Sequence, residues 1–280
     1  SLSGDSQVDT TKGGSGAAIT FTGAINGDQS FALAAGPALI TLSSDIGASV
    51  PLQSFAILSA SGVAIQSVTV VDAIFISSHI TLSEMPLTTF TSQDYGDIFL
   101  GSIDGTAAGL QSLTVSTTGT GEITLGSIGS STALGQVIVT TGSKTFIHSI
   151  NTTDIIKITT PIVLLESSTL TTTDAMITLG PINASSTGDQ TLTLNAGSSE
   201  ILLQGDIGTT ISPGNLDITA AVILFDNASV FTAGSQQYSG STKISKDIVF
   251  QSRGNITFNG RIDPVSGPSN LSLYLGGGTL

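Results

Sequence analysis

Short apolar stretches alternate with polar residues along most of the chain, and the alternation has a period of two. In Ile123-Thr124-Leu125 the outer residues are apolar and the middle one is polar. A period of two places Ile123 and Leu125 on one side of an extended strand and Thr124 on the other. Windows with apolar residues at i, i+3, i+4 and i+7 are almost absent. The pattern therefore predicts many short strands with inward aliphatic side chains and outward Thr or Ser.

One strand phrase recurs every 79 residues, opened in turn by Ile19, Ile98, Ile177 and Ile256. After a polar turn, each copy is followed by a second alternating strand. These second strands are Phe31-Ala32-Leu33, Leu113-Thr114-Val115, Leu192-Thr193-Leu194 and Leu271-Ser272-Leu273. A repeat of this length without helical segments predicts stacked strands and not a globular α/β domain.

A shorter repeat lies inside the long one. From the first isoleucine of a copy to the next related strand, the chain advances 21 residues (Ile19 to Ile40), 25 (Ile98 to Ile123) and 24 (Ile177 to Ile201). That length suits one coil of a β-solenoid with two or three strands. The 79-residue unit is then a super-repeat of three to four coils. We expect one continuous all-β domain over residues 1–280, a rod of roughly twelve to fourteen coils and about 60 Å.

The corners between the strands should be made by glycines that follow recurring strand ends. The pairs Asn26-Gly27, Asp104-Gly105, Ile128-Gly129 and Ile207-Gly208 stand at matching places in the repeats. Glycine reaches positive φ angles without steric cost, and tight corners need such angles.

Composition narrows the range of functions. The chain has no cysteine, so it contains no disulfide or thiolate metal site, and its net charge is −13. That balance argues against nucleic-acid binding. Aromatic residues make up only 5% of the chain, which fits a narrow interior filled with aliphatic side chains. The densest apolar stretch, Val68 to Ile76, is interrupted by Asp72 and is too short to span a bilayer.

The two ends of the sequence indicate that it belongs to a longer array of the same repeats. The chain begins at Ser1 without a basic and apolar leader. The last copy, Ile256 to Leu280, supplies only about the first third of a repeat.

The phrase Gly121 to Gly129, of the type Gly-x-Ile-Thr-Leu-Gly-x-Ile-Gly, and the segment Gln236-Gln237-Tyr238-Ser239-Gly240 resemble the repeat regions of large bacterial exoproteins of the filamentous haemagglutinin type. The resemblance covers most of the chain. It implies a right-handed parallel β-helix, export across the outer membrane and a place in a surface adhesin or fibre. These residues do not resemble the family's amino-terminal secretion domain, so the resemblance leaves the export route open.

Parallel β-helices also include enzymes that act on polysaccharides, and these need clustered carboxylates. The acidic candidates are Asp94 with Asp97, Asp104, Asp154, Asp174 and Asp206. Most stand beside Gly, Thr or Ser, where Asp favours turns. The histidines His79 and His148 are not equivalent within the repeat. We therefore predict no catalytic, cofactor-binding or metal-binding residues, and no enzyme.

The sequence gives only weak support for two further kinds of binding site, a calcium site and a basic contact patch. The acidic corners at Asp45 and Asp206 are similar to those of calcium-binding β-rolls, but the nonapeptide repeat of those proteins is missing. The only local cluster of positive charge consists of Lys243, Lys246 and Arg253. We interpret it as a solvated face of one coil, and a contact patch is the less favoured alternative.

The sequence thus favours a structural segment of an extracellular or cell-surface bacterial protein, serving as a rigid stalk or adhesin body. The alternatives are a self-assembling fibre or sheath subunit and, less favoured, a polysaccharide-active enzyme. The expected partners are neighbouring repeats, further copies of the chain, or an unidentified host receptor or glycan. Nucleic acid is not an expected partner.

Overall fold

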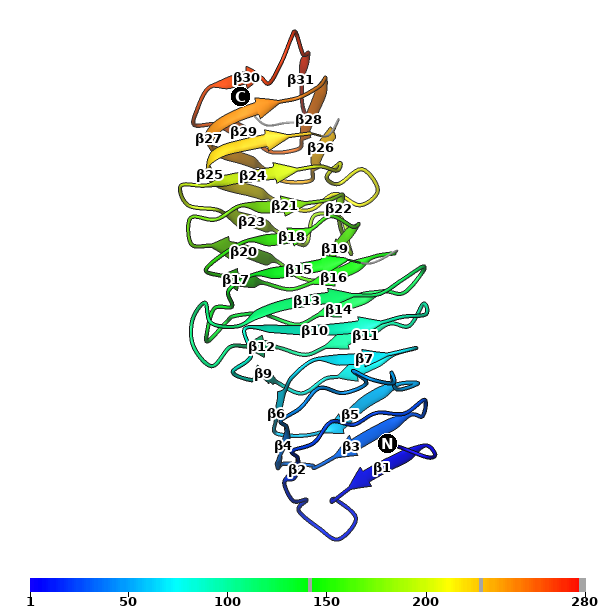
Figure 1. The fold of residues 1–280 in the computed structure, drawn as a ribbon. Coiled ribbons are helices and arrows are strands. Elements are labelled where there is room, and N and C mark those ends of the chain that lie inside the picture. The colour runs from blue at the N-terminus through cyan, green and yellow to red at the C-terminus, as the bar shows by residue number, and fades with distance from the viewer. Residues whose placement is uncertain (141–142, 227–228, 277–280) are drawn as a thin grey trace. The chain divides into compact units, whose positions relative to one another are not determined.

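The computed structural model describes residues 1–140, 143–226 and 229–276, and every regular element in these ranges is a β-strand. All the strand pairs among them are parallel, which makes the fold the all-β parallel β-solenoid that the sequence predicts (Figure 1). The chain forms two compact units, Ser1–Thr145 and Phe146–Leu280. Each unit is described below by itself.

In the first unit, three parallel ladders carry the strands of successive coils. The first ladder contains β1 (Ser6–Asp9), β3 (Phe31–Ala34), β5 (Phe55–Ser59), β8 (Ile74–Ile76), β11 (Ile98–Leu100) and β14 (Ile123–Leu125). The second contains β2 (Ile19–Phe21), β4 (Leu39–Leu42), β6 (Gly62–Ile65), β9 (Ile80–Leu82) and β12 (Ile103–Asp104). The third contains β7 (Val68–Val70), β10 (Leu87–Ser92), β13 (Ser112–Ser116) and β15 (Val137–Thr140).

The second unit repeats this arrangement with longer strands toward its carboxyl end. One ladder contains β16 (Thr145–Ile147), which begins at the boundary, β19 (Ile162–Leu164) and β22 (Ile182–Ala184), and a related one contains β26 (Ser229–Thr232), β28 (Ile248–Ser252) and β31 (Leu271–Leu275). The others contain β17 (Ile150–Thr152), β20 (Ser168–Thr172) and β23 (Leu192–Asn195), and β18 (Ile156–Ile158), β21 (Ile177–Leu179) and β24 (Glu200–Leu203). Both of these continue into β25 (Leu216–Phe225) and β27 (Gln236–Ile244), and then into β29 (Ile256–Phe258) and β30 (Ile262–Pro264).

The coil lengths inferred from the sequence are confirmed by the strand register. Ile19 pairs with Ile40, Ile98 with Ile123, and Ile177 with Ile201. These six residues are buried, and their columns of like side chains fill the interior. The alternation also holds, since Ile123 and Leu125 are buried while Thr124 between them is half-buried.

The 79-residue interval does not equal a whole number of coils. In the first unit, three coils lead from Ile19 through Ile40 and Val63 to Ile80 on the second ladder. Ile98, however, lies two strands further along the chain, in β11 of the first ladder. Equivalent residues of successive copies therefore face different sides of the solenoid.

The second unit gives the same result. Three coils lead from Ile177 through Ile201 and Ile223 to Thr242, and two strands later the chain reaches Ile256 in β29. These two copies each advance by three coils and two strands, within the predicted range of three to four coils. A feature carried by the repeat is consequently not aligned in one row along either unit.

The glycine corners are confirmed at three of the four predicted positions. Gly27, Gly129 and Gly208 have positive φ, but Gly105 does not. At Gly105 the reason for glycine is close approach, because a Cβ atom would lie 2.7 Å from the side-chain oxygen of Gln111. That oxygen accepts a hydrogen bond from the backbone of Thr106, so the buried Gln111 side chain holds the loop.

Candidate functional site

The acidic candidates are spread over different coils, and most of them bond the backbone of the following coil. The Asp97 carboxylate accepts a hydrogen bond from the backbone N–H of Glu122 at 2.8 Å, and Asp206 accepts one from Ser229 at 3.0 Å. Asp45 accepts one from Ser67 at 3.2 Å. These bonds join residues 22 to 25 positions apart. The acidic side chains therefore act as caps between coils.

Asp174 makes the same kind of bond, and the bond also affects its pKa. Its carboxylate accepts the backbone N–H of Ser198 at 2.7 Å, and this bond holds the pKa of Asp174 below its usual value. Asp174 also has a φ of 54°, a left-handed conformation that a short polar side chain tolerates. Asp154 differs, because its backbone carbonyl, and not its carboxylate, accepts a bond from the Thr152 hydroxyl.

The corner that contains Asp94 and Asp97 is unusual for a different reason. Tyr95 lies between them with a φ of 61°, and its side chain is 61% exposed. A tyrosine rarely adopts this conformation. The ring lies against Gly119, where a Cβ atom would collide with it. Glycine at this position in the next coil therefore makes room for the ring.

The histidines lie near carboxylates of neighbouring coils. His79 Nε2 lies 3.9 Å from a carboxylate oxygen of Asp104, and its Nδ1 lies 3.0 Å from the Ser102 hydroxyl. The other Asp104 oxygen already accepts the backbone N–H groups of Ser131 and Thr132. Asp104 is thus held as a cap, which accounts for its burial without a catalytic role.

The other histidine and the basic cluster lie in the second unit. His148 Nε2 lies 3.7 Å from the Glu166 carboxylate. Lys243 lies in β27, and Lys246 follows it at 3.4 Å from the Asp226 carboxylate. Arg253 follows β28 and is exposed. The basic cluster is therefore divided between a strand and two corners.

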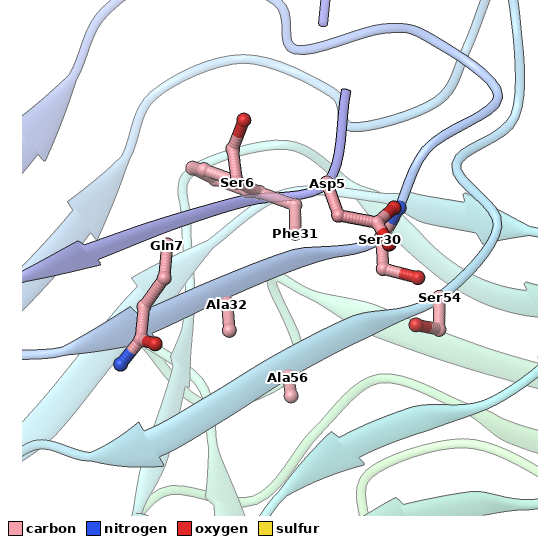
Figure 2. A pocket seen from close by; sticks show the side chains of 8 residues that line it. All are labelled: Asp5, Ser6, Gln7, Ser30, Phe31, Ala32, Ser54 and Ala56. Atoms are coloured by element: carbon pink, nitrogen blue, oxygen red, sulfur yellow. The ribbon is translucent and has the colours of Figure 1, made fainter.

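A hollow opens on the outer side of the first ladder, over its first three strands (Figure 2). Ala32 and Ala56 occupy the outward positions of β3 and β5, and their short side chains leave a space of about 360 Å³. Gln7 of β1 is the register neighbour of Ala32. The remaining lining residues are Asp5, Ser6, Ser30, Phe31 and Ser54. Hydroxyl, amide and carboxylate groups thus surround a small apolar floor.

Further along the same outward column, the two alanines are followed by two phenylalanines. Ala56 pairs with Phe75, and Phe75 pairs with Phe99. The two rings are stacked with centroids 5.1 Å apart, yet they are 44% and 37% exposed. A second hollow of about 240 Å³ borders them, and it is also lined by Asp97 and Glu122.

Comparison with protein-family models, curated proteins and solved structures finds no match for this chain. The part of the chain that the structure describes contains no helix long and apolar enough to cross a membrane. Nor do residues 1–140, 143–226 and 229–276 contain a group of three His, Asp or Glu side chains that could hold a metal ion.

The exposed aromatic pair was not predicted, although the sequence carries a signal for it. In Ile74-Phe75-Ile76 and Ile98-Phe99-Leu100 the period of two places the phenylalanine outward, where related phrases have threonine. That the two rings lie on adjacent coils depends on the register, which the 79-residue interval does not reveal.

Proposed function

We propose that this chain is a structural segment of a secreted or cell-surface protein, in which stacked coils form a stiff body that displays other parts. The observation that supports this most is the use of its polar side chains. Asp97, Asp174 and Asp206 each bond the backbone of the following coil. Each of these carboxylates therefore satisfies a backbone N–H group of the neighbouring coil and so contributes to the stacking of the coils.

The packing supports the same proposal. Backbone hydrogen bonds join strands across the whole length of each unit, and aliphatic columns such as Ile74, Ile98 and Ile123 lie almost fully buried between them. Coils bound in this way resist bending, because a bend would separate hydrogen-bonded strands and open gaps in the interior.

Single-molecule force measurements on the whole chain test the mechanical role. A stiff display segment should stay folded under sustained load and then lengthen in steps of about one coil, since each coil contacts only its neighbours. Extension at negligible force, as a flexible linker gives, would contradict the proposal. Small-angle scattering adds a second test, because a stiff rod should scatter as a particle of constant cross-section, whereas a flexible linker should not.

Self-assembly into a fibre is the alternative that the same material can test. Sedimentation over a wide concentration range should give one species of about 28 kDa if the chain acts as a segment. Growth of long assemblies with concentration would favour the fibre.

A further inference from the structure

The Phe75–Phe99 pair exposes apolar surface that the fold does not require. The same outward column holds Ala32, Ala56 and Thr124 on other coils. Small or polar side chains are therefore compatible with this position. Burial of the two rings against a ligand would remove their apolar surface from water, which is a favourable process.

Two carboxylates lie beside the rings. Asp97 and Glu122 immediately precede β11 and β14, and both line the hollow of about 240 Å³ together with Phe75 and Phe99. The backbone bond from Glu122 to Asp97 fixes the Asp97 side chain at this edge. The other lining residues are Ala73, Ile74, Ile98 and Thr124, none of which carries a charge.

One cation belongs to the same region. The backbone N–H of Ile123 donates to the carbonyl of Lys144, so Lys144 follows Glu122 along this edge of the ladder. Lys144 is exposed, and it can offset part of the charge of Glu122. Asp97 lies one coil further away, which makes it the main source of negative charge next to the rings.

We propose that this groove, defined by Phe75, Phe99, Asp97 and Glu122, binds an arginine or lysine side chain presented by a basic segment of a partner protein. The face of an aromatic ring attracts a cation, and the adjacent carboxylates supply charge-assisted hydrogen bonds. The net charge of −13 also favours approach of a basic partner. A purely apolar partner would instead bury the carboxylates without a counter-charge, which is unfavourable.

Binding at the groove is separate from the structural role and does not depend on it. A chain that fails to bind basic segments can still be a stiff segment, and the force measurement would show this. Conversely, a chain that extends at negligible force can still bind a basic segment at the groove, as long as its coils are folded in the binding experiment.

The experiment uses the whole chain, labelled with ¹⁵N, and a short synthetic peptide with two arginines separated by glycine. A peptide with glutamine in place of arginine is the control probe. We expect the arginine peptide to shift the backbone amide signals of Phe75, Phe99 and Glu122. The shifts should weaken with added salt, because exposed charges are screened.

Two variants locate the binding. Phe75→Ala combined with Phe99→Ala should weaken the affinity for the arginine peptide by about tenfold, since the cation–π contact to the free face of the stacked pair and the apolar surface of both rings are lost. Asp97→Asn keeps the oxygen that accepts the Glu122 N–H and removes only the charge. It should weaken binding by about threefold at low salt. Asp28→Asn, at an exposed site in the same unit, should have no effect.

Three outcomes would overturn the inference. Equal shifts with the glutamine peptide would show that the charge plays no part in recognition. Unchanged binding by the phenylalanine double variant would place the peptide elsewhere. Self-association of the chain that masks the Phe75 and Phe99 signals before peptide is added would assign the groove to a second copy.

Discussion

The closest contacts between aromatic rings lie in the interior of the second unit but on the outer surface of the first. In the second unit, the buried Phe225, Tyr238 and Phe250 form an interior cluster with the half-buried Phe258, and the ring centroids in contact are 4.7 to 5.6 Å apart. The first unit buries phenylalanines too, but its closest ring pair, Phe75–Phe99, lies on the outer surface.

The difference arises from the parity of a residue within its strand. Phe250 is the third residue of Ile248–Ser252 and faces inward with the first, whereas Phe75 is the second residue of Ile74–Ile76 and faces outward. One residue of shift therefore decides between core and surface. The interior cluster also needs polar support, since the Tyr238 hydroxyl donates to Gln236 at 2.9 Å and Gln236 donates to the Gln251 carbonyl at 2.8 Å.

The largest expected effect separates the two aromatic groups directly. Phe250→Ala should destabilise the chain by about 3–5 kcal/mol, because it leaves a cavity among the rings of the second unit. Phe75→Ala, the matched surface change, should stay within about 0.5 kcal/mol. Urea unfolding followed by circular dichroism measures both. Equal effects would mean that the exposed pair is part of the folding core.

A second change should affect the two units alike. Gly47 and Gly208 have a φ of 71° in related corners, and a Cβ atom at either would collide with a backbone carbonyl, that of Thr69 or Phe231. Each substitution to alanine should cost about 1–3 kcal/mol. Gly23→Ala, where no atom lies within 4 Å of the added Cβ, is the control. A large effect at only one corner would show that the coils of the two units are built differently.

Removal of the Tyr238 hydroxyl tests the polar support of the interior cluster. Tyr238→Phe should cost about 1–2 kcal/mol, since it deletes a buried hydrogen bond and keeps the ring. Burial raises the pKa of Tyr238 well above its usual value. The folded state therefore favours the protonated form, and this contribution to stability is present below about pH 10 and is lost as the pH rises above it.

Absorbance at alkaline pH can follow the ionisation. In the unmodified chain one tyrosine should ionise only together with loss of the β-sheet signal, and Tyr238→Phe should abolish that step. Ionisation of all three tyrosines before unfolding would contradict the buried assignment.

The smallest expected effect is that of acid. Hydrogen bonds lower the pKa of Asp174, Asp226 and Asp247 in the second unit, and that of Asp9 in the first. A lowered folded-state pKa gives stability that is present above the unfolded value of about 4 and is lost as the pH falls through the folded value. Hydrogen exchange below pH 4 should therefore show earlier loss of protection in the second unit. Asp174→Asn should reduce this difference, and simultaneous loss in both units would argue against it.

Much of the coil geometry could be predicted from the sequence. The pairs Ile19–Ile40, Ile98–Ile123 and Ile177–Ile201 are register partners because like aliphatic residues stack when each strand pairs with its counterpart one coil away. The positive φ angles at Gly27, Gly129 and Gly208 could also be predicted from the sequence, since few other residues allow such corners.

The placement of the repeats could not be predicted. β25 (Leu216–Phe225) passes a corner without ending as a strand, and its halves pair with β23 and β24. A shift in register between Thr219 and Val222 marks that corner. A count of strands from the sequence alone would therefore miscount the sides of the coil. For the same reason, the hollow over Ala32 and Ala56 emerges only when the coils are stacked.

The strands, their parity and the length of a coil follow from the order of the amino acids, because these properties depend on local alternation and on the few residues that permit tight corners. Which face of a coil each repeat occupies, and which outward residues become neighbours, follows from the stacking of the coils. Those properties depend on the sum of all the corner lengths along the chain. The contact between Phe75 and Phe99, 24 residues apart, is a product of that sum.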